Sequence, residues 1–304
     1  MPTHTPLNIW QKTLDRTVSA LASGALQSIP THYEWLEDNG IQFLVRIVDN
    51  IRRKVEAKKE QKKRGPDFNP FLPYEEELFV TDLSPTHVAL LNKFNVVEHH
   101  LLIITRAFES QESLLTIRDF EALWAVLREI DGFAFYNGGR LAGASQPHKH
   151  LQVIPLPFVP DDPQPHARLP IEPLIKASLP AAGVATVPTL PFQQAIAPLN
   201  LTVTMPVAQA AQQLQAAYHA LLQACDMAIG DGVSATPAAG AYNLLATRDW
   251  MFLVPRTEEG VGKIGVNSLG FAGALLVKNE KQLQRLKQSR PIEILAQVGK
   301  SRAV

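Results

Sequence analysis

The sequence predicts an α+β fold in which an antiparallel sheet with flanking helices is extended by a C-terminal α/β segment. Three observations lead to this prediction. Short apolar runs follow one another closely, as in a sheet whose neighbouring strands are also neighbours in sequence. Segments with apolar residues at helical spacing lie before, between and after these runs. The 304 residues, 46% hydrophobic and 19% charged, are enough for a large buried core.

The order of the elements follows from the spacing of the apolar residues. Helical spacing predicts helices over about residues 8–28, 119–127 and 207–228. Short apolar runs predict strands at 41–48, 77–80, 88–94, 100–105, 133–136 and 147–154. After the third helix a second β-element is expected, with strands at 242–246, 251–255 and 274–277.

Prolines divide the chain, because they recur from Pro157 to Pro191 and make continuous secondary structure there improbable. We therefore predict an N-terminal part over 1–160, a proline-rich linker or crossover over 161–195, and a C-terminal part over 196–304. The basic stretch 52–64 before a Pro/Gly-rich segment is most simply a mobile surface loop. The alternative is that one or two of its lysines close over a polyphosphate.

Charge and cysteine content narrow the class of protein. The 29 basic and 29 acidic residues cancel, so nothing global favours a nucleic-acid or membrane partner, and any anion site must be local. The single cysteine, Cys225, excludes an internal disulfide framework and fits a reducing compartment. The N-terminus lacks a basic start followed by an apolar stretch. We expect a cytoplasmic protein.

The most informative segment is Gly-Ala-Ser-Gln-Pro-His-Lys-His-Leu-Gln at 143–152. If residues 147–154 form a strand, its period of two places His148, His150 and Gln152 on one face, about 6.6 Å apart. The opposite face is expected to hold Lys149, Leu151 and Val153. Small residues just upstream let backbone N–H groups approach an anion, and neutral side-chain donors follow them. These upstream residues are Gly143, Ala144, Ser145 and Gln146.

This pattern predicts a phosphate site with a nucleophile. A neutral imidazole attacks phosphorus readily and can pass the phosphoryl group on. One buried histidine alone would be read as a satisfied core residue, and two histidines at i and i+2 could share a zinc ion. No third histidine, cysteine or clear acidic ligand lies nearby in sequence, so we predict no metal site in the protein.

The segment closely resembles the active-site signature of the diadenosine tetraphosphate phosphorylases, also called ATP adenylyltransferases, of the histidine-triad superfamily. The resemblance covers most of the chain outside the proline-rich middle. It extends to Phe-Asn-Pro-Phe-Leu-Pro (68–73), to 90–97 and 100–111, and, after the linker, to 242–247, 250–256 and 266–273. It implies a histidine-triad-like sheet in which the C-terminal part completes a nucleotide site.

By this resemblance, His150 is the nucleophile that takes an adenylyl group and releases ATP, after which phosphate attacks to give ADP. His148 would orient the nucleophile, and Gln152 would donate a hydrogen bond to the reacting phosphate. Gln152 stands where other relatives carry a third histidine. Because a neutral amide cannot supply a proton, it suits transfer between good phosphate leaving groups rather than acid-assisted hydrolysis.

The resemblance also implies binding residues. Asn137 and residues 143–146 would meet the phosphates, and Asn92, Lys93 and Lys54 the nucleotide. The distal side of the site would be closed by Asn243, Thr247 and Arg256, whose guanidinium is a planar fork suited to phosphate. Several of these residues have a purely structural alternative. Asn137 and Asn243 could be turn or strand-end residues, and Lys93 could be a surface lysine. Arg256 could be a solvated partner of Glu258 or Glu259.

The predicted function is therefore reversible phosphorolysis of diadenosine tetraphosphate to ADP and ATP. Its partners would be diadenosine polyphosphates, ATP, ADP and phosphate, with Mg²⁺ carried by the polyphosphate. The protein is expected to be a monomer or weak dimer. Three alternatives remain: turnover of adenosine 5′-phosphosulfate or sulfate in the same site, a hexose-1-phosphate uridylyltransferase, and a sensor that binds dinucleotide polyphosphates without turnover.

Overall fold

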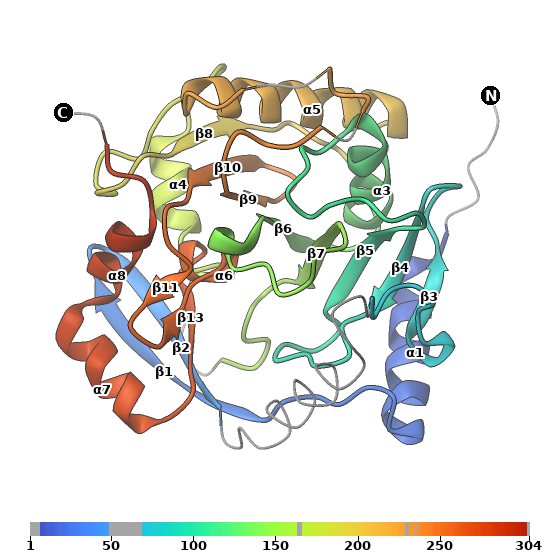
Figure 1. Cartoon of the computed structure of the whole chain (residues 1–304), viewed down its shortest axis with the longest axis horizontal. Coiled ribbons are helices and arrows are strands. Elements are labelled where there is room, and N and C mark those ends of the chain that lie inside the picture. The colour runs from blue at the N-terminus through green and yellow to red at the C-terminus, as the bar shows by residue number, and fades with distance from the viewer. Residues whose placement is uncertain (1–6, 49–68, 163–165, 229–230, 235, 303–304) are drawn as a thin grey trace.

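The main sheet has eight strands and runs through the middle of the molecule (Figure 1). The computed structural model describes residues 7–48, 69–162, 166–228, 231–234 and 236–302. The strand order is β3-β4-β5-β7-β6-β9-β10-β8, and each neighbouring pair is antiparallel. The strands are β3 Phe79–Asp82, β4 His87–Leu91, β5 Leu101–Thr105, β6 Gly132–Gly138, β7 His150–Pro155, β8 Ala195–Pro198, β9 Tyr242–Ala246 and β10 Trp250–Pro255. The predicted α+β fold with an antiparallel sheet is confirmed.

A second sheet joins the two ends of the chain. Strands β1 (Thr31–Asp38) and β2 (Ile41–Val48) form a hairpin, and β13 (Ala274–Val277) pairs parallel to β2. A short hairpin of β11 (Gly260–Val261) and β12 (Ile264–Gly265) stands apart. The expectation of a separate C-terminal β-element was wrong in one respect, because β9 and β10 extend the main sheet. They do so because β9 pairs with β6 and supplies hydrogen-bond partners for its backbone N–H and C=O groups.

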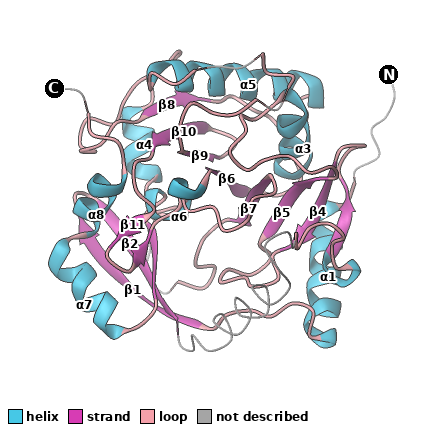
Figure 2. Ribbon diagram, in the orientation of Figure 1, coloured by secondary structure: helices cyan, strands magenta, loops and turns pink. Residues whose placement is uncertain are grey.

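Helices cover the main sheet on one face and accompany the small sheet on the other (Figure 2). The first group is α1 Ile9–Ser23, α3 Ile117–Leu127 and α5 Val207–Ala224. The second is α4 Glu172–Ser178, α6 Ser268–Phe271, α7 Glu280–Ser289 and α8 Pro291–Val298. Short 3₁₀ turns are η1 Glu76–Leu78 and η2 Arg140–Ala142. None of the described helices is long and apolar enough to cross a lipid bilayer.

Local chemistry explains where the observed elements depart from the predicted ones. The first helix ends at Ser23 because Gly24 adopts a left-handed conformation with φ of 78°. The proline-rich segment contains the helix α4. This helix tolerates Pro173 because the proline lies in its first turn, where the backbone N–H groups have no partner within the helix. Strand β7 begins only at His150, because the backbone before it bonds the segment after β5: the N–H of Lys149 donates to the Glu109 carbonyl, and the N–H of Gln111 donates to the Pro147 carbonyl.

The alternation predicted for β7 is confirmed. Leu151 and Val153 enter the core shared with α1, α3 and α5, whereas Ile154 enters the core facing the small sheet. His150 and Gln152 have the same parity as Ile154. The histidine-bearing face therefore lies on the side of the main sheet opposite α3.

Candidate active site

The candidate site lies on β7, between β5 and β6 in the main sheet. His148, His150 and Gln152 are all buried. The ring of Phe71 contacts both imidazoles, with centroid separations of 5.7 Å to His148 and 5.4 Å to His150. Because these neighbours exclude water, the charge state of each imidazole is set by its hydrogen bonds and by burial.

His148 is held as one neutral tautomer. Its Nε2 lies 2.8 Å from the carbonyl oxygen of Thr105, which can only accept, so the proton is on Nε2. Its Nδ1 then accepts from the side-chain amide of Asn69 at 2.8 Å. Burial lowers the pKa of His148, although the Thr105 carbonyl opposes this shift. The ring is thus fixed in orientation from both sides.

His150 is held as the opposite tautomer. Its Nδ1 lies 2.8 Å from the carbonyl oxygen of His148, so Nδ1 carries the proton and Nε2 carries the lone pair. Burial lowers the pKa of His150 to about 4, although the hydrogen bond to the His148 carbonyl opposes this shift. At neutral pH the ring is therefore uncharged, and its free electron pair is on Nε2.

Gln152 is oriented by a histidine that the sequence analysis did not select. Nε2 of His100 donates to Oε1 of Gln152 at 3.0 Å, and Nδ1 of His100 accepts from the amide of Asn92 at 3.1 Å. The carbonyl end of the Gln152 amide is thereby fixed, which leaves the NH₂ end as the donor for other partners. His100 precedes β5 and stands at the start of the matching block 100–111, the only sequence signal that pointed to it.

Gln111 is a second residue that sequence reasoning missed. Its Oε1 accepts from the backbone N–H of His150 at 2.7 Å, and its Nε2 donates to the His150 carbonyl at 3.3 Å. The same Nε2 donates to the carbonyl of Asn137 at 2.9 Å. The amide therefore satisfies backbone groups at the point where β6 and β7 diverge, and it fixes the main chain of His150.

Asn137 and Asn243 face each other across β6 and β9. The Asn243 amide donates to Oδ1 of Asn137 at 2.9 Å, and Ser268 donates to the same oxygen from its backbone and hydroxyl. Arg256 donates to Oδ1 of Asn243 at 2.5 Å. Its other N–H groups reach the carbonyls of Val298, Glu258 and Val266. The guanidinium expected to bind phosphate is thus directed at protein acceptors in this structure.

The loop at 143–146 closes a tight turn beside this network. The N–H of Gly143 donates to the carbonyl of Arg140 at 2.9 Å, and the N–H of Ala144 donates to that of Gly139 at 3.3 Å. Two of the backbone donors predicted to meet phosphate are therefore used within the turn. Ser145 is exposed and Gln146 partly so, which leaves their side chains accessible.

Replacing Gly143 with alanine is expected to destabilise the protein by about 1–3 kcal/mol. Gly143 has a φ of 87°, and a Cβ there would lie 2.7 Å from Cβ of Asn267 and 2.8 Å from the carbonyl of Val266. Gly183→Ala is the matched control, because Gly183 has a φ of 79° with open space around it. Denaturant unfolding should show the larger loss for Gly143→Ala; equal losses would contradict the steric argument.

Other predicted residues lie outside the cluster around His150. Lys93 forms an ion pair with Glu75, with Nζ 2.6 Å from Oε1, at the molecular surface. Thr247 lies in the β9–β10 turn, where its hydroxyl accepts from the N–H of Asp249, at the opposite end of β9 from Asn243. Lys54 lies outside the described residues. Within the described ranges, no group of three or more His, Cys, Asp or Glu side chains could hold a metal ion.

The folded protein is expected to lose stability as the pH falls from about 6.5 to about 4. His100 and His150 each have a pKa lowered from 6.5 to about 4 by burial. In this window the unfolded chain binds protons that the folded chain does not, so each histidine costs about 3 kcal/mol by pH 4. Denaturant unfolding between pH 7.5 and 4.5 measures this loss. An equally steep profile for a folded His100→Asn variant would contradict the assignment to His100.

Comparisons with known proteins agree with this geometry. Residues 1–177 match the family model of the Ap4A phosphorylase N-terminal domain, and residues 188–301 match that of the ATP adenylyltransferase C-terminal domain. The chain is 30% identical over 303 residues to diadenosine 5′,5′′′-P1,P4-tetraphosphate phosphorylase 2 of Saccharomyces cerevisiae, covering 92% of this chain and 90% of that protein.

Solved structures give the same answer. The crystal structure of yeast Ap4A phosphorylase Apa2 superimposes with a TM-score of 0.76 at 26% identity, covering 98% of this chain and 96% of that one. The complex of Apa2 with AMP has a TM-score of 0.71 at 25% identity, with coverages of 98% and 99%. The family models and the yeast relative together show that the chain belongs to the Ap4A phosphorylase (ATP adenylyltransferase) family.

Proposed function

We propose that the protein is a nucleotidyltransferase that phosphorolyses diadenosine tetraphosphate (Ap4A) to ADP and ATP. In the first step Nε2 of His150 attacks the α-phosphorus, the bond from that phosphorus to the bridging oxygen breaks, and ATP leaves. In the second step inorganic phosphate attacks the adenylyl-histidine, ADP forms and the imidazole is regenerated. The same two steps in reverse make Ap4A from ADP and ATP.

The observation that carries this proposal is the tautomer of His150. The His148 carbonyl holds the proton on Nδ1, so the lone pair on Nε2 is ready without prior proton transfer. As the Nε2–P bond forms, positive charge develops on the ring. The same carbonyl oxygen, 2.8 Å away, accepts a stronger hydrogen bond from Nδ1 at that moment.

Gln152 favours transfer over hydrolysis. With its carbonyl end bound to His100, its NH₂ can donate to a phosphate oxygen but cannot protonate a leaving group. ATP in the forward direction, and inorganic phosphate in the reverse direction, leave as stable anions and need no general acid. The matched relatives are phosphorylases, so neither the adenosine 5′-phosphosulfate alternative nor the sensor is favoured.

We further propose the ligands and setting of the reaction. The ligands are Ap4A, ATP, ADP and inorganic phosphate, and a divalent cation, Mg²⁺, enters with the polyphosphate, held by phosphate oxygens and water. Nucleic acid and membrane are not proposed as partners, since acidic and basic residues balance at 29 each. The protein would act in the cytoplasm, as its single cysteine suits a reducing compartment, and as a monomer or weak dimer.

The test uses Ap4A labelled at its α-phosphates, with and without inorganic phosphate. Without phosphate, we expect ATP release and label on His150, located by peptide mapping after an alkaline quench because phosphoramidates are labile in acid. With phosphate, equal amounts of ADP and ATP should accumulate. Release of AMP at the same rate with or without phosphate would show a hydrolase instead. Binding of Ap4A without any turnover would show a sensor.

A further inference from the structure

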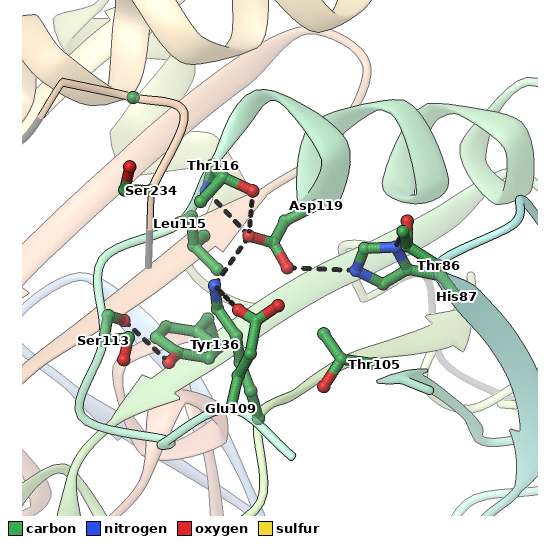
Figure 3. Close-up of polar contacts among 12 residues, drawn as sticks. Thr86, His87, Thr105, Glu109, Ser113, Leu115, Thr116, Asp119, Tyr136 and Ser234 are labelled. Atoms are coloured by element: carbon green, nitrogen blue, oxygen red, sulfur yellow. Dashed lines mark hydrogen bonds and ion pairs between the residues drawn. The ribbon is translucent and has the colours of Figure 1, made fainter. Parts of the chain in front are cut away.

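A buried charged cluster lies on the face of β7 opposite the histidines. The side chain of Lys149 is fully buried, and its Nζ lies 2.8 Å from Oδ2 of Asp119 and 3.0 Å from Oε2 of Glu109. Asp119 is on α3, while Glu109 lies in the segment between β5 and α3 (Figure 3). None of these three residues has a part in the chemistry proposed above, yet Lys149 lies between His148 and His150 in the sequence.

Asp119 is a rigid anchor for Lys149. Its carboxylate accepts from the backbone and the hydroxyl of Thr116 at the start of α3, and from Nε2 of His87 at 3.1 Å (Figure 3). Burial alone would raise the pKa of Asp119, but the hydrogen bond from His87 and the charge of Lys149 lower it to about 2. The ammonium is thus tied to a carboxylate that is itself bound from several sides.

Glu109 holds Lys149 a second time through the backbone. The N–H of Lys149 donates to the Glu109 carbonyl at 2.8 Å. That N–H belongs to the same peptide group as the His148 carbonyl, which accepts from Nδ1 of His150. In a planar trans peptide the N–H and C=O point in opposite directions, so fixing one aims the other. The two bonds also polarise one another through the shared amide.

We propose that Lys149 is a positioning residue, which through Glu109 and Asp119 clamps the peptide whose carbonyl selects the Nδ1–H tautomer of His150. The clamp rests on the proposed function, because it serves a nucleophilic Nε2. Without it, the 148–149 peptide is free to tilt and the proton of His150 is no longer held on Nδ1. A fraction of the molecules would then carry the proton on Nε2 and lose the nucleophile.

The main test removes both charges of the buried pair, because removing one alone would leave an unpaired charge inside the protein. In Lys149→Met/Asp119→Asn, we expect kcat for Ap4A phosphorolysis to fall about 10- to 100-fold with KM within about threefold. Nitrogen-15 NMR of the histidines should show Nε2–H signal for His150 beside the Nδ1–H signal of the wild type. The control is Asp38→Asn/Arg290→Met, which removes a distant ion pair and should change neither quantity.

A second variant tests the proposal if the double variant does not fold. Glu109→Leu removes one acceptor at a partly exposed position and keeps the buried Lys149–Asp119 pair. It should shift kcat and tautomer in the same direction by a smaller amount. A folded variant of either kind with the wild-type kcat and only Nδ1–H would overturn the proposal. The NMR measurement of the His150 tautomer does not depend on turnover. An inactive wild type would therefore refute the proposed function, and the tautomer of each variant could still be compared with that of the wild type.

Discussion

Replacing His150 with alanine is expected to lower the rate of Ap4A phosphorolysis by at least about 10³-fold and to abolish covalent labelling by the adenylyl group. The variant lacks the only ring in the described site whose Nε2 lone pair is set free by a hydrogen bond from Nδ1 to the His148 carbonyl. Initial rates with saturating Ap4A and phosphate, together with peptide mapping after labelling, measure the effect.

The control for this experiment is His219→Ala, since His219 lies on α5, away from β7. It should keep wild-type turnover and labelling. Undiminished turnover in His150→Ala would remove the adenylyl-histidine mechanism. The loss should also be specific to chemistry, so binding of Ap4A by His150→Ala, followed by calorimetry, should remain within about tenfold of wild type.

Replacing Gln111 with leucine is expected to have the second largest effect. It would leave the His150 N–H without its partner inside the protein, at about 1–3 kcal/mol, and would remove one of the two donors to the Asn137 carbonyl, which keeps the N–H of Gly139. We expect a stability loss of about 1–4 kcal/mol and a fall in kcat of about 10²-fold from displacement of His150. Denaturant unfolding and single-turnover rates on the folded fraction separate the two effects.

A matched control is Gln194→Leu. Gln194 is also buried, and its Nε2 donates to the Val187 carbonyl at 2.9 Å, while its Oε1 has no partner among the described residues. Its loss should lower stability by a smaller amount and leave kcat unchanged. Equal losses of kcat in the two variants would show that Gln111 acts through general stability rather than through the main chain of His150.

The part of the site that lies within one short sequence segment could be predicted from sequence. A period of two is a local property, so it places His148, His150 and Gln152 on one face and Lys149 on the other without any information about strand pairing. The ion pair of Lys149 with α3 confirms that assignment. Local spacing could not show which nitrogen of each ring carries the proton, because that depends on Thr105, Asn69 and the His148 carbonyl.

The partners brought by other strands were out of reach for the same reason. His100 meets Gln152 only because β5 pairs with β7 in a register that places Leu102 opposite Gln152. From sequence, Arg256 is predicted to bind phosphate. Only the folded structure shows that its N–H groups donate to acceptors within the protein, namely the Asn243 side chain and the carbonyls of Val266 and Val298. Pairing between distant strands is set by the whole core, which no short window contains.

The pairing of β6 with β9 makes the two regions matched by separate family models parts of one continuous sheet. A fragment ending near residue 177 would present β6 as a bare edge with Asn137 deprived of Asn243, and would also lose β13 from beside β2. Such an edge invites pairing with other chains. Neither matched region is therefore expected to fold cooperatively without the other, because the sheet continues across the boundary between them.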